Sequence, residues 1–244
     1  LLTGCVMDGL FAHVHAATRR TLARAGYREI QAPEQTCCGA LHAHAGLLVQ
    51  ARELARRNIE AFERSEPDWI ITDSAGCGAG LKDYPAWFAD EPEWRERAAA
   101  LAERARDVTE VLAAALTSGA LDAGLSSPIG LEGRVGYDAP CHLHHGQGVT
   151  EEPLEVLRAV PGLEVEALPS SDRCCGGGGI YNLAQPDLAA LVRAPKVGEV
   201  RRGSFDWIAT GNPGCIMYLG AGLLRSGDRT PVVHPVELVD RAWS

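Results

Sequence analysis

The cysteines of this chain fall into two sets with the same order and nearly the same spacing. Each set has one cysteine, an adjacent pair followed by glycine, and one further cysteine. The sets are Cys5, Cys37, Cys38 and Cys77, then Cys141, Cys174, Cys175 and Cys215. Matching members are 136 residues apart at the first position (5 to 141), 137 at the pair (37 to 174) and 138 at the last (77 to 215). A near-constant offset indicates an internal duplication, so we expect two similar units.

Hydrophobic patterning predicts the same alternation of strands and helices in both halves. In the first half we expect strands at 1–5, 28–33 and 68–77, with helices over about 11–25 and 46–63. In the second half the matching strands are 134–141, 163–169 and 205–215, with helices over about 151–160 and 186–202. "WIITDSAGC" and "WIATGNPGC" are the closest matching pair of segments.

This alternation predicts an α/β fold with parallel, Rossmann-like sheets and right-handed crossovers. We expect the two units to be related by an approximate two-fold axis, with domains at 1–84 and 131–244. The Ala-rich segment between them, 85–130, is expected to be a helical insertion followed by a linker. Functional crevices in parallel sheets lie beyond the carboxyl ends of the strands. The cysteines of each set lie at or just past such ends, so we expect each set to form one self-contained site.

Composition excludes several classes of protein. The chain has 244 residues, of which 46% are hydrophobic and 23% charged, as in ordinary globular proteins. A net charge of -9 without a basic stripe argues against nucleic acid as a partner. The sequence contains neither a membrane-spanning run nor an export signal, so we expect a cytoplasmic protein. Because the first residue is Leu and lies in an expected strand, we interpret the sequence as part of a longer chain.

Cysteines without an export signal are more typical of metal ligands than of structural disulfides. Isolated free cysteines are often only buried small hydrophobic residues, but a duplicated pattern of eight favours ligation. Soft thiolates select zinc or iron-sulfur clusters. Zinc sites usually come from close C-x2-C pairs, whereas these ligands are spread over three strands, so a cluster is favoured over zinc. Zinc in one or both repeats remains the alternative.

Eight segments together carry a family resemblance. They are "TGCVMD", "CCGALHAHAG", "ARRNIEAFE", "AGCGAGLKDY", "CHLHHGQGV", "CCGGGGIYNL", "NPGC" and "VVHPVEL". They resemble the two cysteine-rich CCG domains in the C-terminal part of the iron-sulfur subunit of bacterial glycolate oxidase (glycolate dehydrogenase). The wider family includes the CCG-containing subunit of heterodisulfide reductase and the lactate-utilisation proteins. The residues after the first CCG, "ALH", differ from those of the lactate-utilisation branch.

The resemblance implies an iron-sulfur electron-transfer subunit of a flavin-linked oxidase that converts glycolate to glyoxylate and passes electrons to a quinone-type acceptor. It implies 4Fe-4S chemistry in this chain, FAD on a partner subunit only, and flavin-bearing subunits as partners. It also implies an N-terminal ferredoxin-like region of the same chain, and a peripheral place at the inner membrane through partners. The chain alone is not expected to be catalytic, and we assign no catalytic residue. A thiol/disulfide redox subunit resembling heterodisulfide reductase and a lactate-utilisation iron-sulfur protein are the alternatives.

One departure from the family concerns the last cysteine of each repeat. Members with the fuller pattern end each repeat in CxxC, whereas this chain reads "CGAG" at 77–80 and "CIMY" at 215–218. Five-thiolate ligation of a noncubane cluster is therefore unsupported, and the missing fifth cysteines favour electron transfer over disulfide cleavage.

Histidines gather near the cysteines, and four of them are candidates to tune a cluster without ligating it. These are His42, His44, His142 and His145. Histidines close to metal ligands commonly orient those ligands or relay protons, so we expect His142 and His145 to matter most.

Overall fold

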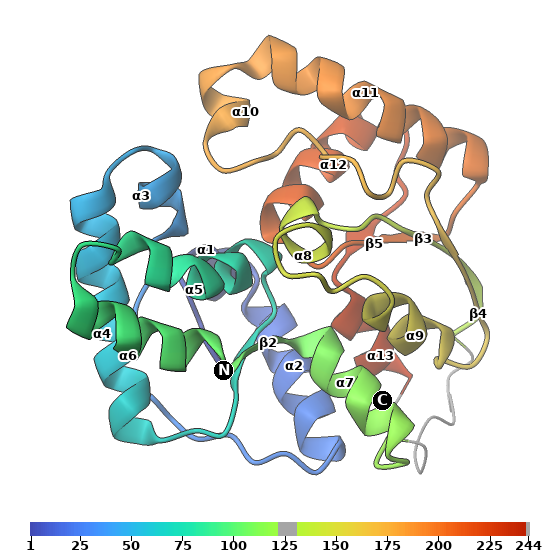
Figure 1. Cartoon of the computed structure of the whole chain (residues 1–244). Helices are drawn as coiled ribbons and strands as arrows, with labels where there is room; N and C mark the ends of the chain where they lie inside the picture. Colours follow the sequence, from blue (N-terminus) through green and yellow to red (C-terminus); the bar gives the residue numbers. More distant parts are fainter. Residues whose placement is uncertain (122–130, 243–244) are drawn as a thin grey trace.

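The computed structural model describes residues 1–121 and 131–242, and it contains two parallel sheets (Figure 1). The first sheet pairs β1 (Ile70–Thr72) with β2 (Ala105–Asp107). The second has the order β4-β3-β5-β6, formed by β3 (Gly133–Tyr137), β4 (Leu163–Ala167), β5 (Trp207–Ala209) and β6 (Val232–Val233). All of these strand pairs are parallel, which confirms the predicted fold class.

Helices cover both faces of the four-stranded sheet. In Figure 1, α11 (Pro186–Gly203) and α12 (Pro213–Arg225) lie on one side of it. On the other side lie α9 (Glu152–Arg158) and α13 (Pro235–Arg241). Short helices follow the cysteines at α8 (Cys141–His144) and α10 (Tyr181–Ala184). The predicted helices at 151–160 and 186–202 are therefore confirmed.

The first half contains the corresponding helices but fewer strands. Its helices are α1 (Val6–Leu10), α2 (Ala12–Arg24), α3 (Ala40–His44), α4 (Leu48–Ser65) and α5 (Ala75–Trp87). The strands expected at 1–5 and 28–33 do not form. Leu2 N donates to Ile71 O at 2.8 Å, so the first segment lies along β1 without becoming a regular strand.

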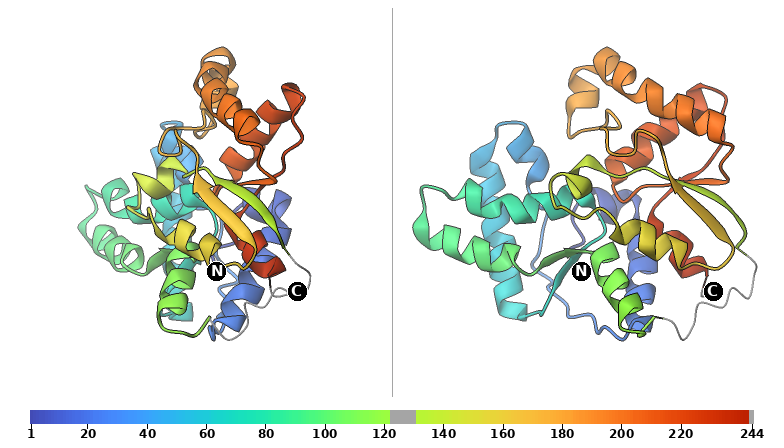
Figure 2. Two further views of the ribbon diagram at one scale, coloured as in Figure 1. Left: turned by 90° about the vertical axis from the view of Figure 1, so that its right-hand side faces the viewer. Right: turned by 45° about the vertical axis from the view of Figure 1, so that its right-hand side comes forward.

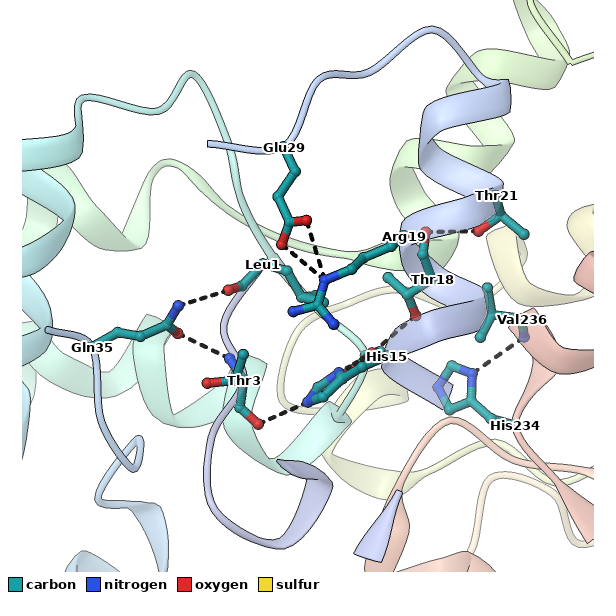
Figure 3. A network of polar contacts seen from close by, with 11 residues as sticks. Leu1, Thr3, His15, Thr18, Arg19, Thr21, Glu29, Gln35, His234 and Val236 are labelled. Atoms are coloured by element: carbon teal, nitrogen blue, oxygen red, sulfur yellow. Dashed lines mark hydrogen bonds and ion pairs between the residues drawn. The ribbon is translucent and has the colours of Figure 1, made fainter. Parts of the chain in front are cut away.

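A side chain replaces the missing strand in the first half. Gln35 donates to Leu1 O at 3.0 Å and accepts from Thr3 N at 2.9 Å (Figure 3). These are the backbone groups that a neighbouring strand would otherwise satisfy. In the second half, β4 pairs with β3 along five residues instead. Within residues 1–121 and 131–242, the first half has two strands where the second has four.

The expected helical insertion is interrupted by a strand. Two helices, α6 (Pro92–Ala102) and α7 (Val108–Thr117), flank β2. The pairing of Ile70 with Ala105 and of Thr72 with Asp107 makes β2 part of the first sheet. The proposed division after residue 84 falls inside α5, and the linker segment 122–130 lies outside the described residues.

The two halves end in the same local motif. Asp107 caps α7 by accepting from Thr109 N at 2.9 Å, and Glu110 accepts from Asp107 N at 2.8 Å. His234 caps α13 by accepting from Val236 N at 3.2 Å, and Glu237 accepts from His234 N at 2.8 Å. Each capping box satisfies backbone N–H groups that the first turn leaves free. The duplication thus extends past the last cysteine of each half.

The halves exchange helix contacts reciprocally. Helix α2 of the first half packs against α13 of the second, and α9 of the second packs against α7 of the first (Figures 1 and 2). Val14, Leu112, Val156 and Val236 meet in one shared core. Such mutual exchange is what an approximate two-fold axis requires. Within the described residues, none of the helices has both the length and the apolar character needed to cross a bilayer.

Burial of Asp107 makes a testable contribution to pH dependence. Burial raises the pKa of this carboxyl from 3.8 to about 7, so folding is favoured by the protonated form and stability falls as pH rises toward 7. Asn keeps the capping acceptor without the charge. When the pH is raised from 5 to 8, we expect urea titrations to show that the free energy of unfolding of wild type falls by about 3 kcal/mol relative to that of Asp107→Asn. The exposed control Asp8→Asn should show no such trend, and parallel pH profiles for wild type and Asp107→Asn would refute the assignment.

Candidate metal centre

All eight cysteines line one cavity of about 150 Å³ between the two halves. One water needs only about 10–15 Å³ by the same measure, so this space is more than a packing defect. Every cysteine is a free thiol. The two sets, each predicted to form one self-contained site, face this common space.

Equivalent local structures present the cysteines. Cys5 precedes α1 and Cys141 begins α8, while both pairs lie in the loops before α3 and α10. The last members, Cys77 and Cys215, lie in the first turns of α5 and α12. The strands expected to run to these two cysteines end earlier, at Thr72 and Ala209. In the second set the cysteines follow the ends of β3, β4 and β5, as predicted, whereas in the first set, within residues 1–121, only Cys77 follows a strand, β1.

Sulfur contacts follow the same order in both sets. In the first, Cys5 Sγ and Cys37 Sγ are 3.4 Å apart, and Cys38 is within hydrogen-bonding reach of Cys37 and Cys77. In the second, Cys174 contacts Cys141 and Cys175, and Cys175 Sγ lies 2.8 Å from Cys215 Sγ. Contacts therefore run from the single cysteine through the pair to the last cysteine, and they stay within a set.

The glycine after each pair is required by the backbone. Gly39 and Gly176 have φ values of 80° and 84°, which side-chain-bearing residues rarely adopt. A Cβ on Gly176 would lie 2.5 Å from Ala189 O, and one on Gly39 would lie 3.1 Å from Ala51 O. The tight turn also directs an N–H toward sulfur: Gly176 N lies 3.3 Å from Cys174 Sγ, and Gly39 N lies 3.5 Å from Cys37 Sγ.

One member of each pair, Cys37 or Cys174, favours the thiolate, whereas the hydrogen bond with that neighbour raises the pKa of Cys38 and Cys175. Hydrogen bonds from Cys38 and Cys5 lower the pKa of Cys37 to about 2, and hydrogen bonds from Cys141 and Cys175 do the same for Cys174. The hydrogen bond from Cys38 likewise lowers the pKa of Cys77. Because the thiolate is the form that ligates metals, this electrostatic environment suits soft metal chemistry.

The thiol arrangement fits a soft, sulfur-ligated group. Among residues 1–121 and 131–242, no three histidine, cysteine or carboxylate side chains converge as a metal ion requires. A structural zinc site needs four ligands around one point. Iron-sulfur clusters are held by several thiolates around a larger group, and the cavity of about 150 Å³ that all eight cysteines line leaves space for a sulfur-ligated group.

The four candidate histidines are not equivalent. His44 and His142 line the cavity and stack across the two halves, with ring centroids 5.5 Å apart. Burial and the nearby His44 lower the pKa of His142, whose Nδ1 lies 3.8 Å from Cys141 Sγ. His145 Nε2 donates to Asp172 O at 2.8 Å, away from the cavity lining. His42 has a buried Nδ1 without a partner in the described part of the chain.

Asn212 connects the two sets directly. Its side-chain oxygen accepts from Gly76 N at 3.0 Å, next to Cys77, and its amide nitrogen lies 3.7 Å from Cys215 Sγ. Ala75 N also donates to Gly211 O at 3.0 Å. These bonds hold the turns before α5 and α12 against each other, so the last cysteines of both sets share one rigid junction.

A buried network behind the first set was not predicted from the sequence. His15 donates from Nδ1 to Asp73 at 2.7 Å, and Thr18 also donates to Asp73. His15 Nε2 donates to Thr3 O at 2.9 Å (Figure 3). Burial alone would lower the pKa of His15, but the hydrogen bond and charge of Asp73 outweigh it and raise the pKa. Complete burial lowers the pKa of the neighbouring His234 to about 4. The network ties the segment before Cys5 to the one before Cys77.

Comparison with known proteins places this arrangement in a family. The cysteine-rich domain family CCG matches residues 1–82 and 135–220, and each match contains one complete cysteine set. The chain belongs to the CCG family. The two matches confirm the duplication inferred from spacing.

Individual relatives in the CCG family share more of the chain. A probable glycolate oxidase iron-sulfur subunit of Bacillus subtilis (strain 168) is 36% identical over 239 residues, covering 97% of this chain and 53% of that protein. Lactate utilization protein A of Geobacillus kaustophilus (strain HTA426) is 32% identical over 241 residues, covering 98% of this chain and 97% of that protein. The chain thus spans about half the length of the first relative. The predicted resemblance to glycolate oxidase iron-sulfur subunits is confirmed, and lactate utilization proteins are similar as well.

Proposed function

We propose that this chain carries electrons as part of the iron-sulfur subunit of a flavin-linked glycolate oxidase. One observation carries the proposal: two complete sets of free thiols, one from each half, line a single cavity. Buried disulfides or ordinary core packing would not leave eight sulfurs around an open space. The relative from Bacillus subtilis gives the substrate class.

The chain's residues perform three tasks in this function. The thiols of each set, with the pairs at their centre, would hold an iron-sulfur cluster, which supplies one-electron chemistry when bound. The N–H groups of Gly39, Gly176 and Gly177 lie 3.3–3.5 Å from cysteine sulfurs and stabilise their negative charge. His44 and His142 line the cavity, where their imidazole rings would influence the electrostatic potential at the thiols. Electron transfer needs only proximity to another carrier, which the shared cavity provides between the two sets.

The remaining parts of the proposal concern the whole assembly. FAD would reside on a partner subunit that oxidises glycolate to glyoxylate, and a quinone-type molecule would accept the electrons. A 4Fe-4S type suits four thiolates per repeat. A ferredoxin-like region in the same protein and attachment to the inner membrane through partners complete the assembly, which is cytoplasmic. This chain supplies the redox centre and no catalytic side chain.

Anaerobic analysis of the assembled complex tests the proposal. We expect iron and acid-labile sulfide in the complex purified through a tag on this chain, in amounts that fall when the cysteines lining the cavity are replaced by serine, and glycolate should bleach its iron-sulfur absorption. Lactate, offered as the control substrate, should not. Zinc without sulfide would defeat the cluster, whereas bleaching by lactate alone would assign the chain to lactate utilisation, the activity named for its other relatives. Consumption of a disulfide at the centre would instead favour the heterodisulfide-reductase alternative.

A further inference from the structure

The helices that support the two cysteine pairs can be compared residue by residue. Helices α4 and α11 both have 18 residues, and α5 and α12 both have 13. Helix α11 starts at residue 186, which is 138 residues after the start of α4 at residue 48. Helix α12 starts at residue 213, which is 138 residues after the start of α5 at residue 75. A residue behind the first pair therefore has a defined counterpart behind the second.

A neutral clamp holds the first pair. Asn58 on α4 is fully buried; it accepts from Thr36 N at 2.7 Å and donates to Cys37 O at 3.0 Å. Tyr84 on α5 donates to Cys38 O at 2.8 Å and accepts from Asn58 at 3.0 Å. Two uncharged side chains thus bind the backbone carbonyls of both cysteines.

A charged residue occupies the position of Asn58 behind the second pair. Lys196 on α11 is 1% exposed; it forms an ion pair with Asp138 and donates to Ser170 O at 2.7 Å and Ser171 O at 3.3 Å. Asp138 lies three residues before Cys141, and Ser171 lies three residues before Cys174. One ammonium group therefore joins the two segments that carry the first cysteine and the pair.

The residues around Lys196 also differ from their counterparts around Asn58 in the first half. The counterpart of Tyr84 is Gly222, where a Cβ would lie 2.6 Å from Arg193 Nε. Arg193, the counterpart of Ala55, donates to Tyr218 O at 2.9 Å. Glu199 accepts from Ser170 N at 3.2 Å and from Ser170 Oγ at 2.8 Å. Charged residues of α11 thus occupy positions whose counterparts in α4 are neutral.

The buried ion pair is costly to break. Removing one member leaves the other desolvated and unpaired, whereas removing both members together is commonly tolerated. Lys196 also donates to two carbonyl groups that no apolar residue can satisfy. The Lys196–Asp138 ion pair therefore fixes the positions of the backbone segments before Cys141 and Cys174, and it also contributes to packing.

We propose that Lys196 is the positioning residue of the second sulfur site, fixing Cys141 against Cys174 and Cys175 through a buried charge. The cysteine pair of the first site is held instead by the neutral Asn58–Tyr84 clamp, so the two sites are chemically unequal and can be disabled separately. The inference rests on the proposed function in taking the thiols as ligands.

Site-resolved alkylation of the anaerobic complex, read by mass spectrometry, tests Lys196. In Lys196→Met we expect labelling of Cys141, Cys174, Cys175 and Cys215 to rise about tenfold or more, with the first set still protected. Lys82→Met, which removes a partly exposed ion pair with Glu110, is the matched control and should match wild type. Iron and sulfide content should fall in the same variant that gains labelling.

A double variant separates positioning from simple charge burial. Asp138→Leu combined with Lys196→Met removes both charges, so we expect its thermal midpoint to recover toward wild type while the second set stays reactive. Full protection of all eight cysteines in the double variant would overturn the proposal, as would equal loss of protection in both sets of Lys196→Met. If wild type holds zinc without sulfide, the proposed function fails while the labelling pattern still decides the role of Lys196. Eight reactive thiols in wild type would overturn both.

Discussion

The Cys175→Ser variant is expected to lose about half of the iron and sulfide bound by the chain, and Cys38→Ser the other half. Thiolates are the principal ligands of such clusters, and serine replaces sulfur by a hard oxygen that soft metals disfavour. Sulfur contacts run within each set, from Cys5 to Cys77 and from Cys141 to Cys215, so each set should lose its own group. Metal and sulfide analysis of anaerobically prepared protein measures the loss. Glycolate-dependent reduction should fall as well.

The shared cavity gives this experiment two further outcomes. If either single variant lost all of its iron, one group would be held jointly by both sets. If both variants kept full occupancy, the adjacent cysteines would only be packed in the core, and the ligation proposal would be wrong. Leu10→Ser is a suitable control, because Leu10 is exposed on α1 close to Cys5 and makes no contribution to the cavity lining.

Asp73→Ala is expected to lower the free energy of unfolding by about 3–5 kcal/mol near pH 6. The substitution leaves His15 buried without its carboxylate partner and also removes the acceptor of Thr18. Because the pairing raises the pKa of His15, its contribution is complete below the unfolded-state value of 6.5 and is lost as pH rises through the folded-state value. The loss in Asp73→Ala should therefore be smaller at pH 9 than at pH 6.

Urea unfolding at the two pH values measures this effect. Thr18→Val removes one hydrogen bond to Asp73 while keeping the side-chain shape, so it should cost only about 1 kcal/mol at both pH values. An equal cost for Asp73→Ala at pH 6 and pH 9 would show that the His15–Asp73 contact is not an ion pair.

The parts of the fold that could be predicted are those specified by local patterns. The helices α2 and α4 carry apolar residues at helical spacing, and the cysteine offset by itself indicates the duplication. The strand β2 could not be predicted in this way. Its three residues lie between two Ala-rich helices, and they are extended because they pair with β1, far away in sequence. Such non-local pairing overrides local propensity.

The shape of the site also could not be predicted from local sequence patterns. Spacing placed four cysteines together in each half, but the common cavity depends on how the halves pack through α2, α13, α7 and α9. The strand expected at 28–33 was lost because Gln35 satisfies the backbone of Leu1 and Thr3. Lys196 gave no sequence signal as part of the site, since a lysine in a helix is normally solvated. Its role emerged only from its burial and its equivalence to Asn58.

The exchange of helices between the halves has a consequence for biosynthesis. Helix α2 is synthesised well before its packing partner α13 is complete at Arg241. Until then the nascent first half lacks a surface that its core requires, and the cavity wall contributed by Cys215 does not exist. We therefore expect cluster insertion to follow synthesis of α13, with the thiols of the first half open to oxidation until then.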